Sequence, residues 1–292
     1  MIYIHFIVNP ISGKGNHNIT NTLLSVYFPS SKYKIKVDYT EYKGHAILLA
    51  RDAVENGPDC IVACGGDGTI SEVAAVMVNL EIPLGIVPVG SGNGLASNLR
   101  IPKDVGLAVK MIKNRRESFI DVGKVNNQYF FSNMGIGIDA VIIRKYEENN
   151  QRSLYGYIKA ALWASLNYKP FDTVVILNGR TLEMRPFMLF VSNSNEMGYN
   201  MGLTPDAELN DGLLDLVIVP ELNFWEKLYL GYCILTNSST RFNKASRESI
   251  RHIDIELPDK IFLDIQTDGE YHNFRTNKLQ VEVIKNGLRV IC

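Results

Sequence analysis

The stretch "VACGGDGTISEV", residues 62–73, interrupts an apolar run with two glycines, an aspartate and a third glycine, and then continues with helical spacing. A short apolar run before a turn is typical of a buried strand, and the spacing after the turn is typical of a helix. Glycine lets another group approach the backbone closely, because it has no side chain. The stretch therefore predicts a strand, a tight glycine turn and a helix in direct succession.

The same alternation extends over the first 121 residues. The expected strands are residues 2–8, 33–40, 60–64 and 83–88, and the expected helices are residues 44–57 and 70–80. Strands that alternate with helices imply right-handed crossovers and a mostly parallel sheet with helices on both faces. We therefore expect residues 1–121 to form an open α/β domain.

The pattern changes after residue 121. Strand-like runs follow one another at residues 128–143, 173–194, 211–220, 261–274 and 279–292. Turn dipeptides separate or interrupt them at Asn178-Gly179, Asp268-Gly269 and Asn286-Gly287, and two helical inserts are expected near residues 153–167 and 223–236. This predicts a β-rich antiparallel sandwich or barrel over residues 122–292, with the extreme C-terminal residues able to return to the first domain.

The composition argues against several classes of function. The formal net charge of -1 argues against nucleic acid as a partner, because nucleic-acid-binding domains usually carry a basic excess. The four cysteines are scattered and two lie in apolar strand-like runs, which suits a reducing cytosol. No run approaches the roughly 20 apolar residues that a membrane-spanning helix needs, and the first residues lack a charged leader. We expect a cytoplasmic protein.

Three loops follow the carboxyl ends of the expected parallel strands, where open α/β sheets bind ligands. They are "NPISGKG", residues 9–15, "GGDGT", residues 65–69, and "GSGNG", residues 90–94. Converging backbone N–H groups and a helix N-terminus attract phosphate, so we expect a polyphosphate against the glycines at 65, 66 and 68. Asp67 would repel a bare phosphate, and we expect its carboxylate to hold Mg²⁺ or one of its waters. Each loop alone is equally well explained as a tight strand-to-helix turn.

Other nucleotide and metal motifs are disfavoured. The first loop is not of the G-x-x-x-x-G-K-[ST] type, because Gly15 follows Lys14. The third loop matches G-x-G-x-x-G only in part, because Leu95 takes the last position, and this disfavours hydride chemistry. The five histidines form no pair with metal-ligand spacing, so transition-metal chemistry has no support.

Seven stretches in order along nearly the whole chain carry a family resemblance. The stretches "NPISGKG", "GGDGTISEV", "PVGSGNGLA", "FIDVGKVN", "NMGIGIDA", "ELNDGLLDL" and "TDGE" resemble the diacylglycerol kinase catalytic family, which includes bacterial soluble lipid kinases, sphingosine kinases and ceramide kinases. The resemblance implies an ATP- and Mg²⁺-dependent lipid kinase. It also implies an N-terminal nucleotide domain, a β-rich lipid domain, and ATP and Mg²⁺ bound between them.

Carried over by motif, the resemblance implies specific site residues. The implied ATP contacts are Asn9, Pro10, Ser12, Gly13, Thr40, Gly66, Asp67, Gly68, Thr69, Ile70, Ser71, Glu72 and Ser91. Asp67 and Asp121 would share the network of catalytic metal and water. We expect Asp67→Asn to leave folding intact and to lower turnover by several orders of magnitude.

Acids of the second half have competing interpretations. From the residues alone, Asp268-Gly269 favours a hairpin turn, whereas the resemblance makes Glu270 or Asp268 the base for the lipid hydroxyl. Asp139 is expected to cap a turn or, by resemblance, to meet the substrate head group. On its own pattern the stretch "ELNDGLLDL", residues 208–216, is a turn before a strand. By resemblance it holds a structural Mg²⁺ through the Asp211 carboxylate and the carbonyls of Glu208 and Leu213.

The acceptor is left open at this stage. Bacterial diacylglycerol kinases usually have an aspartate where this chain has Gly94, so diacylglycerol, a sphingoid base, ceramide and related lipids all stay candidates. A kinase for a soluble acceptor such as NAD, and a non-catalytic lipid-binding protein, are the rivals. A homodimer is also left open.

The segment 222–235 carries several aromatic residues, and basic residues follow it at 241, 244, 247 and 251. Such a segment would suit contact with an anionic bilayer, as expected of a cytoplasmic protein that visits the inner membrane surface. A core-packing helix with a solvated basic tail explains it equally well.

Overall fold

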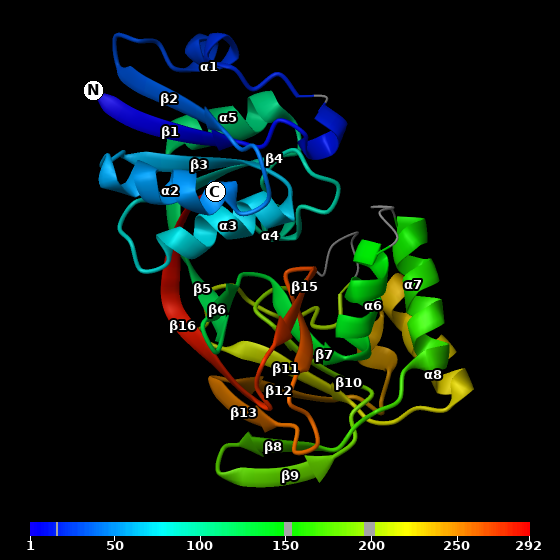
Figure 1. Cartoon of the computed structure of the whole chain (residues 1–292). Coiled ribbons are helices and arrows are strands. Elements are labelled where there is room, and N and C mark those ends of the chain that lie inside the picture. Colours follow the sequence, from blue (N-terminus) through cyan, green and yellow to red (C-terminus); the bar gives the residue numbers. More distant parts are fainter. Residues whose placement is uncertain (16, 149–153, 196–201) are drawn as a thin grey trace. The chain divides into compact units, whose positions relative to one another are not determined.

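The computed structural model describes residues 1–15, 17–148, 154–195 and 202–292 (Figure 1). The chain forms two compact units. Unit 1 comprises Met1–Ile120 and Asn286–Cys292, and unit 2 comprises Asp121–Lys285. The sequence-based boundary after residue 121 lies one residue from this division, and Asp121 belongs to unit 2.

Unit 1 contains a parallel sheet in the order β2-β1-β3-β4-β16. Its strands are β1 (Ile2–Val8), β2 (Tyr33–Tyr39), β3 (Cys60–Gly65), β4 (Leu84–Pro88) and the last part of β16 (Lys278–Ile291). The inner strands β1, β3 and β4 are almost fully buried, as expected of a sheet covered on both faces. Val290 of β16 lies opposite Leu84 of β4 in parallel register.

Helices cover both faces of this sheet (Figure 1). They are α1 (Asn21–Tyr27), α2 (His45–Glu55), α3 (Asp67–Met77), α4 (Gly94–Asn98) and α5 (Val105–Asn114), with a 3-10 turn η1 (Ser12–Gly15) in the first loop. Helix α3 begins at Asp67, three residues before the predicted start at 70. Gly66 before it is extended, and Gly68 is already part of the helix. The sequence interpretation did not include α1, α4 or α5.

Unit 2 contains a six-stranded antiparallel sheet in the order β12-β11-β10-β7-β14-β15. Its strands are β7 (Asn133–Gly137), β10 (Met188–Ser192), β11 (Leu214–Val219), β12 (Ser246–Ile250), β14 (Leu263–Thr267) and β15 (Glu270–Phe274). A second layer contains β5 (Glu117–Val125), β6 (Gln128–Phe130), β8 (Thr173–Leu177), β9 (Arg180–Met184), β13 (His252–Glu256) and the first part of β16. Apolar side chains of both layers form one core, which gives the expected sandwich.

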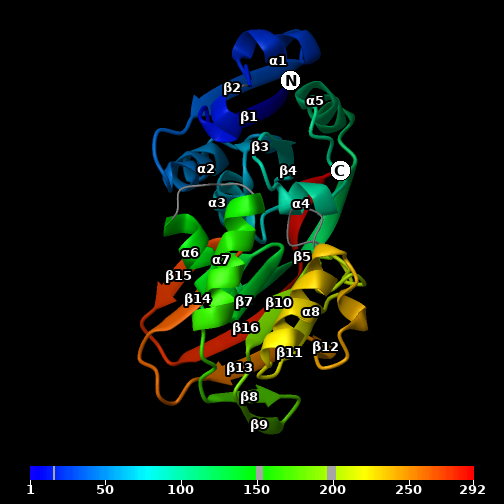
Figure 2. The ribbon, with the colours of Figure 1, turned by 90° about the vertical axis from the view of Figure 1, so that its right-hand side faces the viewer.

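The other face of the six-stranded sheet is covered by helices (Figure 2). These are α6 (Ile138–Glu148), α7 (Leu154–Asn167) and α8 (Phe224–Leu235). Alternate residues of one strand separate the two cores: Leu189 and Val191 of β10 join the sandwich core, whereas Met188 and Phe190 pack against the helices. A 3-10 turn, η2 (Ser239–Arg241), follows α8.

Two expectations for the second half are wrong. The run 128–143 was expected as strand, but β7 ends at Gly137, whose φ of 86° is a left-handed conformation, and α6 follows. Asn286-Gly287 is not a hairpin turn. It lies inside β16, and Asn286 has a φ of 54° where the strand passes from unit 2 to unit 1. Within the described ranges, no helix is long and apolar enough to span a bilayer.

Candidate active site

The three predicted loops of unit 1 lie side by side. Backbone hydrogen bonds join them at the carboxyl ends of the strands: the N–H of Asn9 donates to the carbonyl of Cys64, and the N–H of Val89 donates to the carbonyl of Gly65, both at 2.9 Å. Parallel strands end at the same edge of a sheet, which is why loops that are far apart in the sequence meet here. The Thr40 N–H also donates to the Val8 carbonyl at this edge.

Asp67 connects the second loop to the third. It is the first residue of α3, and its Oδ2 and Oδ1 atoms accept the N–H groups of Asn93 at 2.7 Å and Gly94 at 2.6 Å. Asn93 is buried with a φ of 59°, and its own side chain bonds both backbone groups of Gly90. These bonds fix the third loop. They remain compatible with a hydrated cation, because a carboxylate has about four acceptor sites.

Close packing within the protein accounts for two of the three glycines in "GGDGT". A Cβ atom on Gly65 would lie 2.5 Å from Cβ of Thr69. A Cβ atom on Gly66 would lie 3.3 Å from Cα of Gly90, and one on Gly90 would lie 2.4 Å from Cα of Gly66. The expectation that a polyphosphate excludes side chains at residues 65 and 66 is therefore unnecessary, since Thr69 of the same loop crowds residue 65 and Gly90 of the third loop crowds residue 66.

The N-terminus of α3 retains the property that attracts an anion. Gly66 stands at the N-cap position and has no side chain to accept the first-turn N–H groups. Nδ2 of Asn9 donates to Oγ1 of Thr69, in that first turn, at 3.0 Å. This hydrogen bond joins the first loop to the helix. A helix N-terminus of this kind, flanked by two more loops, suits phosphate oxygens.

The remaining predicted ATP contacts fall into different environments. Ser12 lies beside Gly66, and Pro10, Gly13 and Ser91 are exposed in the same group of loops, whereas Ser71 and Glu72 are half-buried on α3. Glu72 accepts the N–H of Gly44 at 2.9 Å, so its carboxylate anchors the start of α2. Ile70 is buried in the core and its N–H donates to the Gly66 carbonyl, so it offers a nucleotide no polar group.

In unit 2 the two predicted bases have different surroundings. The carboxylate of Asp268 accepts the N–H groups of Phe131 at 2.9 Å, Ser132 at 2.7 Å and Asn133 at 3.2 Å. Its backbone N–H donates to the Asn133 carbonyl, and its φ is 49°. Asp268 therefore holds the β14–β15 turn against the start of β7, while Glu270, half-buried, opens β15.

Asp139 lies in the first turn of α6 and is 2% exposed. Its Oδ2 atom accepts Nε2 of Gln266 at 2.7 Å, and burial raises the pKa of Asp139 to about 6 although this hydrogen bond lowers it. A Cβ atom on Gly135 would lie 2.0 Å from the same oxygen, so glycine is required there. Asp139 therefore does not merely cap a turn.

Gln266 was missed by the sequence interpretation. Besides Asp139, its Nε2 atom donates to Oδ1 of Asn133 at 2.9 Å, and its Oε1 atom accepts the N–H of Gly269 at 3.0 Å. It thus links the helix start, strand β7 and the turn that precedes Glu270. The one signal was a polar residue within the buried strand "LDIQT".

Asp121 is fully buried in unit 2. Its Oδ2 atom accepts the N–H of Gly212 at 2.6 Å, and its own N–H donates to the Leu209 carbonyl at 2.7 Å. Its carbonyl accepts Nδ2 of Asn193. Asp121 therefore positions the segment that is predicted to hold the structural Mg²⁺. Asp67, which is expected to share the catalytic metal network with Asp121, belongs to unit 1.

The predicted structural Mg²⁺ ligands lie on residues 208–213, the segment that Asp121 positions. Asp211 is exposed, and its Oδ1 atom accepts the N–H of Leu213 at 2.9 Å, while Glu208 is also exposed. An exposed carboxylate is a hard oxygen donor of the kind that Mg²⁺ prefers. No group of three or more His, Cys, Asp or Glu side chains suited to a metal occurs in the described part of the chain.

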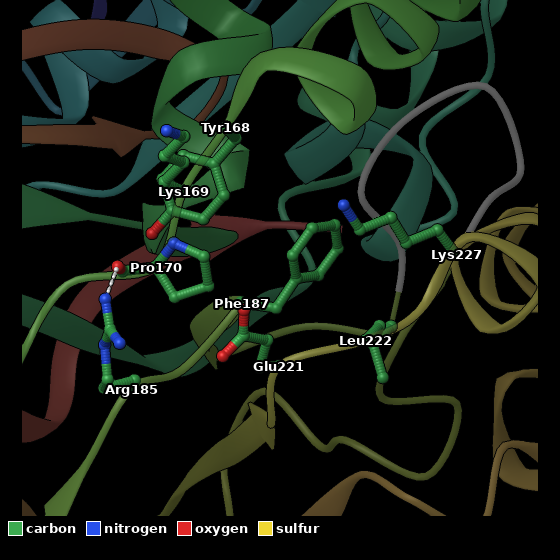
Figure 3. Close-up of a pocket in the computed structure, with 8 residues that line it drawn as sticks. All are labelled: Tyr168, Lys169, Pro170, Arg185, Phe187, Glu221, Leu222 and Lys227. Atoms are coloured by element: carbon green, nitrogen blue, oxygen red, sulfur yellow. Dashed lines mark hydrogen bonds between the residues drawn. The ribbon is translucent and has the colours of Figure 1, made fainter.

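Two cavities of about 240 Å³ each lie within unit 2, and no predicted site residue lines either of them. Figure 3 shows the first, where Phe187 lies among residues 168–170, which follow α7, and Lys227 of α8. Arg185 donates to the Pro170 carbonyl at its edge. The second is lined by acids, serine and threonine around Arg247.

Two family models match the chain. The diacylglycerol kinase catalytic domain matches residues 3–125, and the YegS C-terminal NAD kinase beta sandwich-like domain matches residues 132–292. Curated relatives named diacylglycerol kinase, from Staphylococcus aureus strains bovine RF122 / ET3-1 and MRSA252, are each 29% identical over 272 and 273 residues. Each alignment covers 91% of this chain and 85% of the relative.

Solved structures from Bacillus anthracis strain Sterne share the fold. One, described as a diacylglycerol kinase, aligns with a TM-score of 0.72 and 21% identity over 99% of this chain and 96% of that chain. A second aligns with a TM-score of 0.78 and 22% identity over 99% and 94%. These likenesses establish the two-domain architecture for this chain.

Proposed function

The chain belongs to the diacylglycerol kinase catalytic family and is a lipid kinase, and from this premise we propose that it transfers the γ-phosphoryl group of ATP, with Mg²⁺, to a hydroxyl of a membrane lipid. The names of the relatives favour diacylglycerol over a sphingoid base or ceramide. A non-catalytic lipid carrier is disfavoured by the family.

One observation supports the nucleotide site above the others. The uncapped N-terminus of α3 lies among three loops that Asp67 and Asn9 bind together. Its N–H groups and the helix dipole would stabilise the negative charge of a triphosphate, and Asn9, Ser12 and Ser91 would add polar contacts. Phosphoryl transfer depends mainly on such positioning and electrostatics.

The base assignment follows from the contacts of the β14–β15 turn. Protonation of Asp268 would disrupt its bonds to three backbone N–H groups, so we assign it a positioning role. Glu270 then accepts the proton of the lipid hydroxyl, and Gln266 orients the turn through the N–H of Gly269. Asp139, which bonds Gln266, is assigned to the substrate head group.

Two divalent cation sites belong to this proposal. Asp67 and water would hold the catalytic Mg²⁺, and Asp211 with the carbonyls of Glu208 and Leu213 would hold a structural one. Asp121, which is fully buried and accepts the Gly212 N–H, would position the segment of the structural site. When bound at the nucleotide, Mg²⁺ offsets charge on the phosphate oxygens. We place the protein in the cytoplasm and at the inner membrane surface, with ATP and lipid as its partners.

The proposal is tested by transfer of radiolabelled phosphate from ATP. Purified protein is incubated with vesicles that contain diacylglycerol, ceramide or a sphingoid base, or with soluble NAD, and the label is partitioned between organic and aqueous phases. We expect label in the organic phase with diacylglycerol, and transfer slower by about a hundredfold or more after Glu270→Gln. Label in the aqueous phase with NAD alone would favour the rival soluble acceptor.

A further inference from the structure

The exposed side of helix α8 is apolar throughout. Its exposed apolar residues are Phe224, Trp225, Leu228, Tyr229, Tyr232 and Leu235, and Trp225 is 75% exposed. The buried side carries Leu230 and Cys233. A surface helix normally presents charged and polar residues to water, so α8 has the opposite arrangement.

Both charged residues of α8 are bonded to the rest of unit 2. Glu226 forms a capping box with Asn223 and an ion pair with Lys244. Lys227 donates to the Ser165 carbonyl of α7 at 2.9 Å, and its Nζ atom lies 5.1 Å from the centroid of the Phe187 ring. The charges of the helix therefore stabilise its position and do not cover its outer side.

Helix α7 has a similar outer side. Tyr155, Leu162, Trp163 and Leu166 are exposed, with Leu166 at 72%, while Ala160 and Ala164 face the core. Lys159 is the one charged residue in its sequence. Small residues on the inner side and large apolar residues on the outer side again reverse the usual pattern.

These two outer sides form one surface. Helices α7 and α8 cover the same face of the six-stranded sheet (Figure 2), and Lys227 of α8 donates to the Ser165 carbonyl of α7. Their inner residues share one core with Phe190 and Val217 of that sheet, so the exposed residues point away from it. We name the ten exposed apolar residues of α7 and α8 the α7–α8 face.

We propose that the α7–α8 face docks on the surface of an anionic lipid bilayer. This inference rests on the proposed function, since a lipid kinase must reach its acceptor in a membrane. Contiguous exposed apolar patches of this kind mark interaction sites in soluble proteins. Helices that lie in the bilayer interface bury an apolar side and keep cations at the edge.

The charges around the face are mostly positive. Residues 154–172 contain two lysines and one aspartate, which pairs with Arg185, and residues 236–251 contain three arginines, one glutamate and one lysine, which pairs with Glu226. Lys169, Arg185 and Lys227 line the cavity of Figure 3, between the end of α7 and the start of α8, together with Glu221. Cations near an anionic surface each contribute to binding.

The same charges disfavour a second copy of the chain as the occupant. A two-fold dimer brings the same patch of both subunits together, so basic edges would meet basic edges. An anionic bilayer instead complements them. The aromatic composition agrees, because tryptophan and tyrosine prefer the boundary between hydrocarbon and water.

The two tryptophans of the chain, Trp163 and Trp225, both lie on this face and report on it directly. Each is observed alone in Trp225→Phe and Trp163→Phe, respectively. With vesicles of phosphatidylcholine and phosphatidylglycerol, we expect the emission of both variants to shift to shorter wavelength and to be quenched by brominated acyl chains. With phosphatidylcholine alone we expect a weaker response. No shift and no quenching with either vesicle would overturn the proposal.

Charge substitutions supply the second test. Leu166→Glu and Leu228→Glu should weaken binding to the anionic vesicles at least about tenfold. Leu107→Glu is the matched control, because Leu107 is a 51% exposed helical leucine in unit 1, and it should bind like the unchanged protein. An equal loss of vesicle binding in all three variants would contradict docking through the α7–α8 face. So would a dimer in light scattering that Leu228→Glu dissociates.

A soluble substrate separates this inference from the proposed function. Short-chain diacylglycerol dissolved as monomers needs no docking, so Leu166→Glu and Leu228→Glu should phosphorylate it at the rate of the unchanged protein. If the unchanged protein binds vesicles but phosphorylates neither this lipid nor lipid in vesicles, docking stands and the proposed activity fails. If it phosphorylates both without binding vesicles, the reverse holds.

Discussion

The carboxylate of Asp67 is bound to the backbone of Asn93: its Oδ2 atom accepts that N–H at 2.7 Å, and its Oδ1 atom accepts the next N–H, of Gly94. From the sequence we expected Asp67→Asn to leave folding intact. The two accepted bonds argue for a cost in stability, because an asparagine side chain has one oxygen and would turn its NH₂ group toward the second N–H.

We therefore predict that Asp67→Asn lowers both stability and turnover. The lost bond to a charged acceptor should cost about 2 kcal/mol of unfolding free energy. Turnover should fall at least about a hundredfold. Denaturant titration and the radiolabel assay measure the two effects. Asp104→Asn is the control, because Asp104 caps α5 through the Leu107 N–H and asparagine caps equally well.

Asp268 and Glu270 should respond oppositely to amide substitution. Asp268→Asn keeps one oxygen for the N–H groups of Ser132 and Asn133 but removes the charge and turns an NH₂ group toward the N–H of Phe131, so we expect a loss of about 2 kcal/mol in unfolding free energy. Glu270→Gln should change stability less than Asp268→Asn does and lower kcat by about 10² to 10⁴. Near-normal kcat in Glu270→Gln would assign the base elsewhere.

Asp139 should make stability depend on pH. Its pKa is raised from 3.8 to about 6 by burial, so the folded state holds a proton that the unfolded state releases between these values. Stability should then fall as pH rises from about 4 to about 6, by up to about 3 kcal/mol. Asp139→Asn should flatten this slope in thermal unfolding scans, because the amide does not titrate. An unchanged dependence of stability on pH in Asp139→Asn would show that it does not come from Asp139.

Magnesium should stabilise the protein through Asp211 in the absence of ATP. A ligand that binds the folded state raises the melting temperature by mass action, so we expect a higher Tm in Mg²⁺ than in EDTA. Asp211→Ala should abolish the difference, whereas Asp206→Ala, a change of the same kind five residues away, should retain it. Equal Tm values of the unchanged protein in Mg²⁺ and EDTA would argue against the structural site.

The sequence predicted the parts of the fold that depend on local patterns. The apolar run before Gly65 and the helical spacing after it gave β3 and α3, and Asn178-Gly179 and Asp268-Gly269 gave two hairpin turns. Helix α5 also had a local signal, since Asp104 caps an apolar periodic segment. Residues 138–143 had an ambiguous signal, because an apolar run of that length suits a strand or a buried helix.

The contacts of the site needed the tertiary structure. Asp268 and the N–H groups of Phe131 and Ser132 are more than 130 residues apart, so no local pattern separates its role from that of Glu270. The same holds for the bond between Asp139 and Gln266, 127 residues apart. The resemblance pointed to acids of the site, but their positioning partners depend on strand pairing.

Strand β16 has a consequence for how the molecule is made. Residues 286–292 complete unit 1, where Val290 pairs with Leu84 and the Cys292 N–H donates to the Arg116 carbonyl. On the ribosome, the first 120 residues therefore emerge with the edge of β4 bare, and an unpaired edge invites aggregation. Unit 1 is therefore complete only after residues 286–292 have been translated, so its folding is coupled to the synthesis of unit 2.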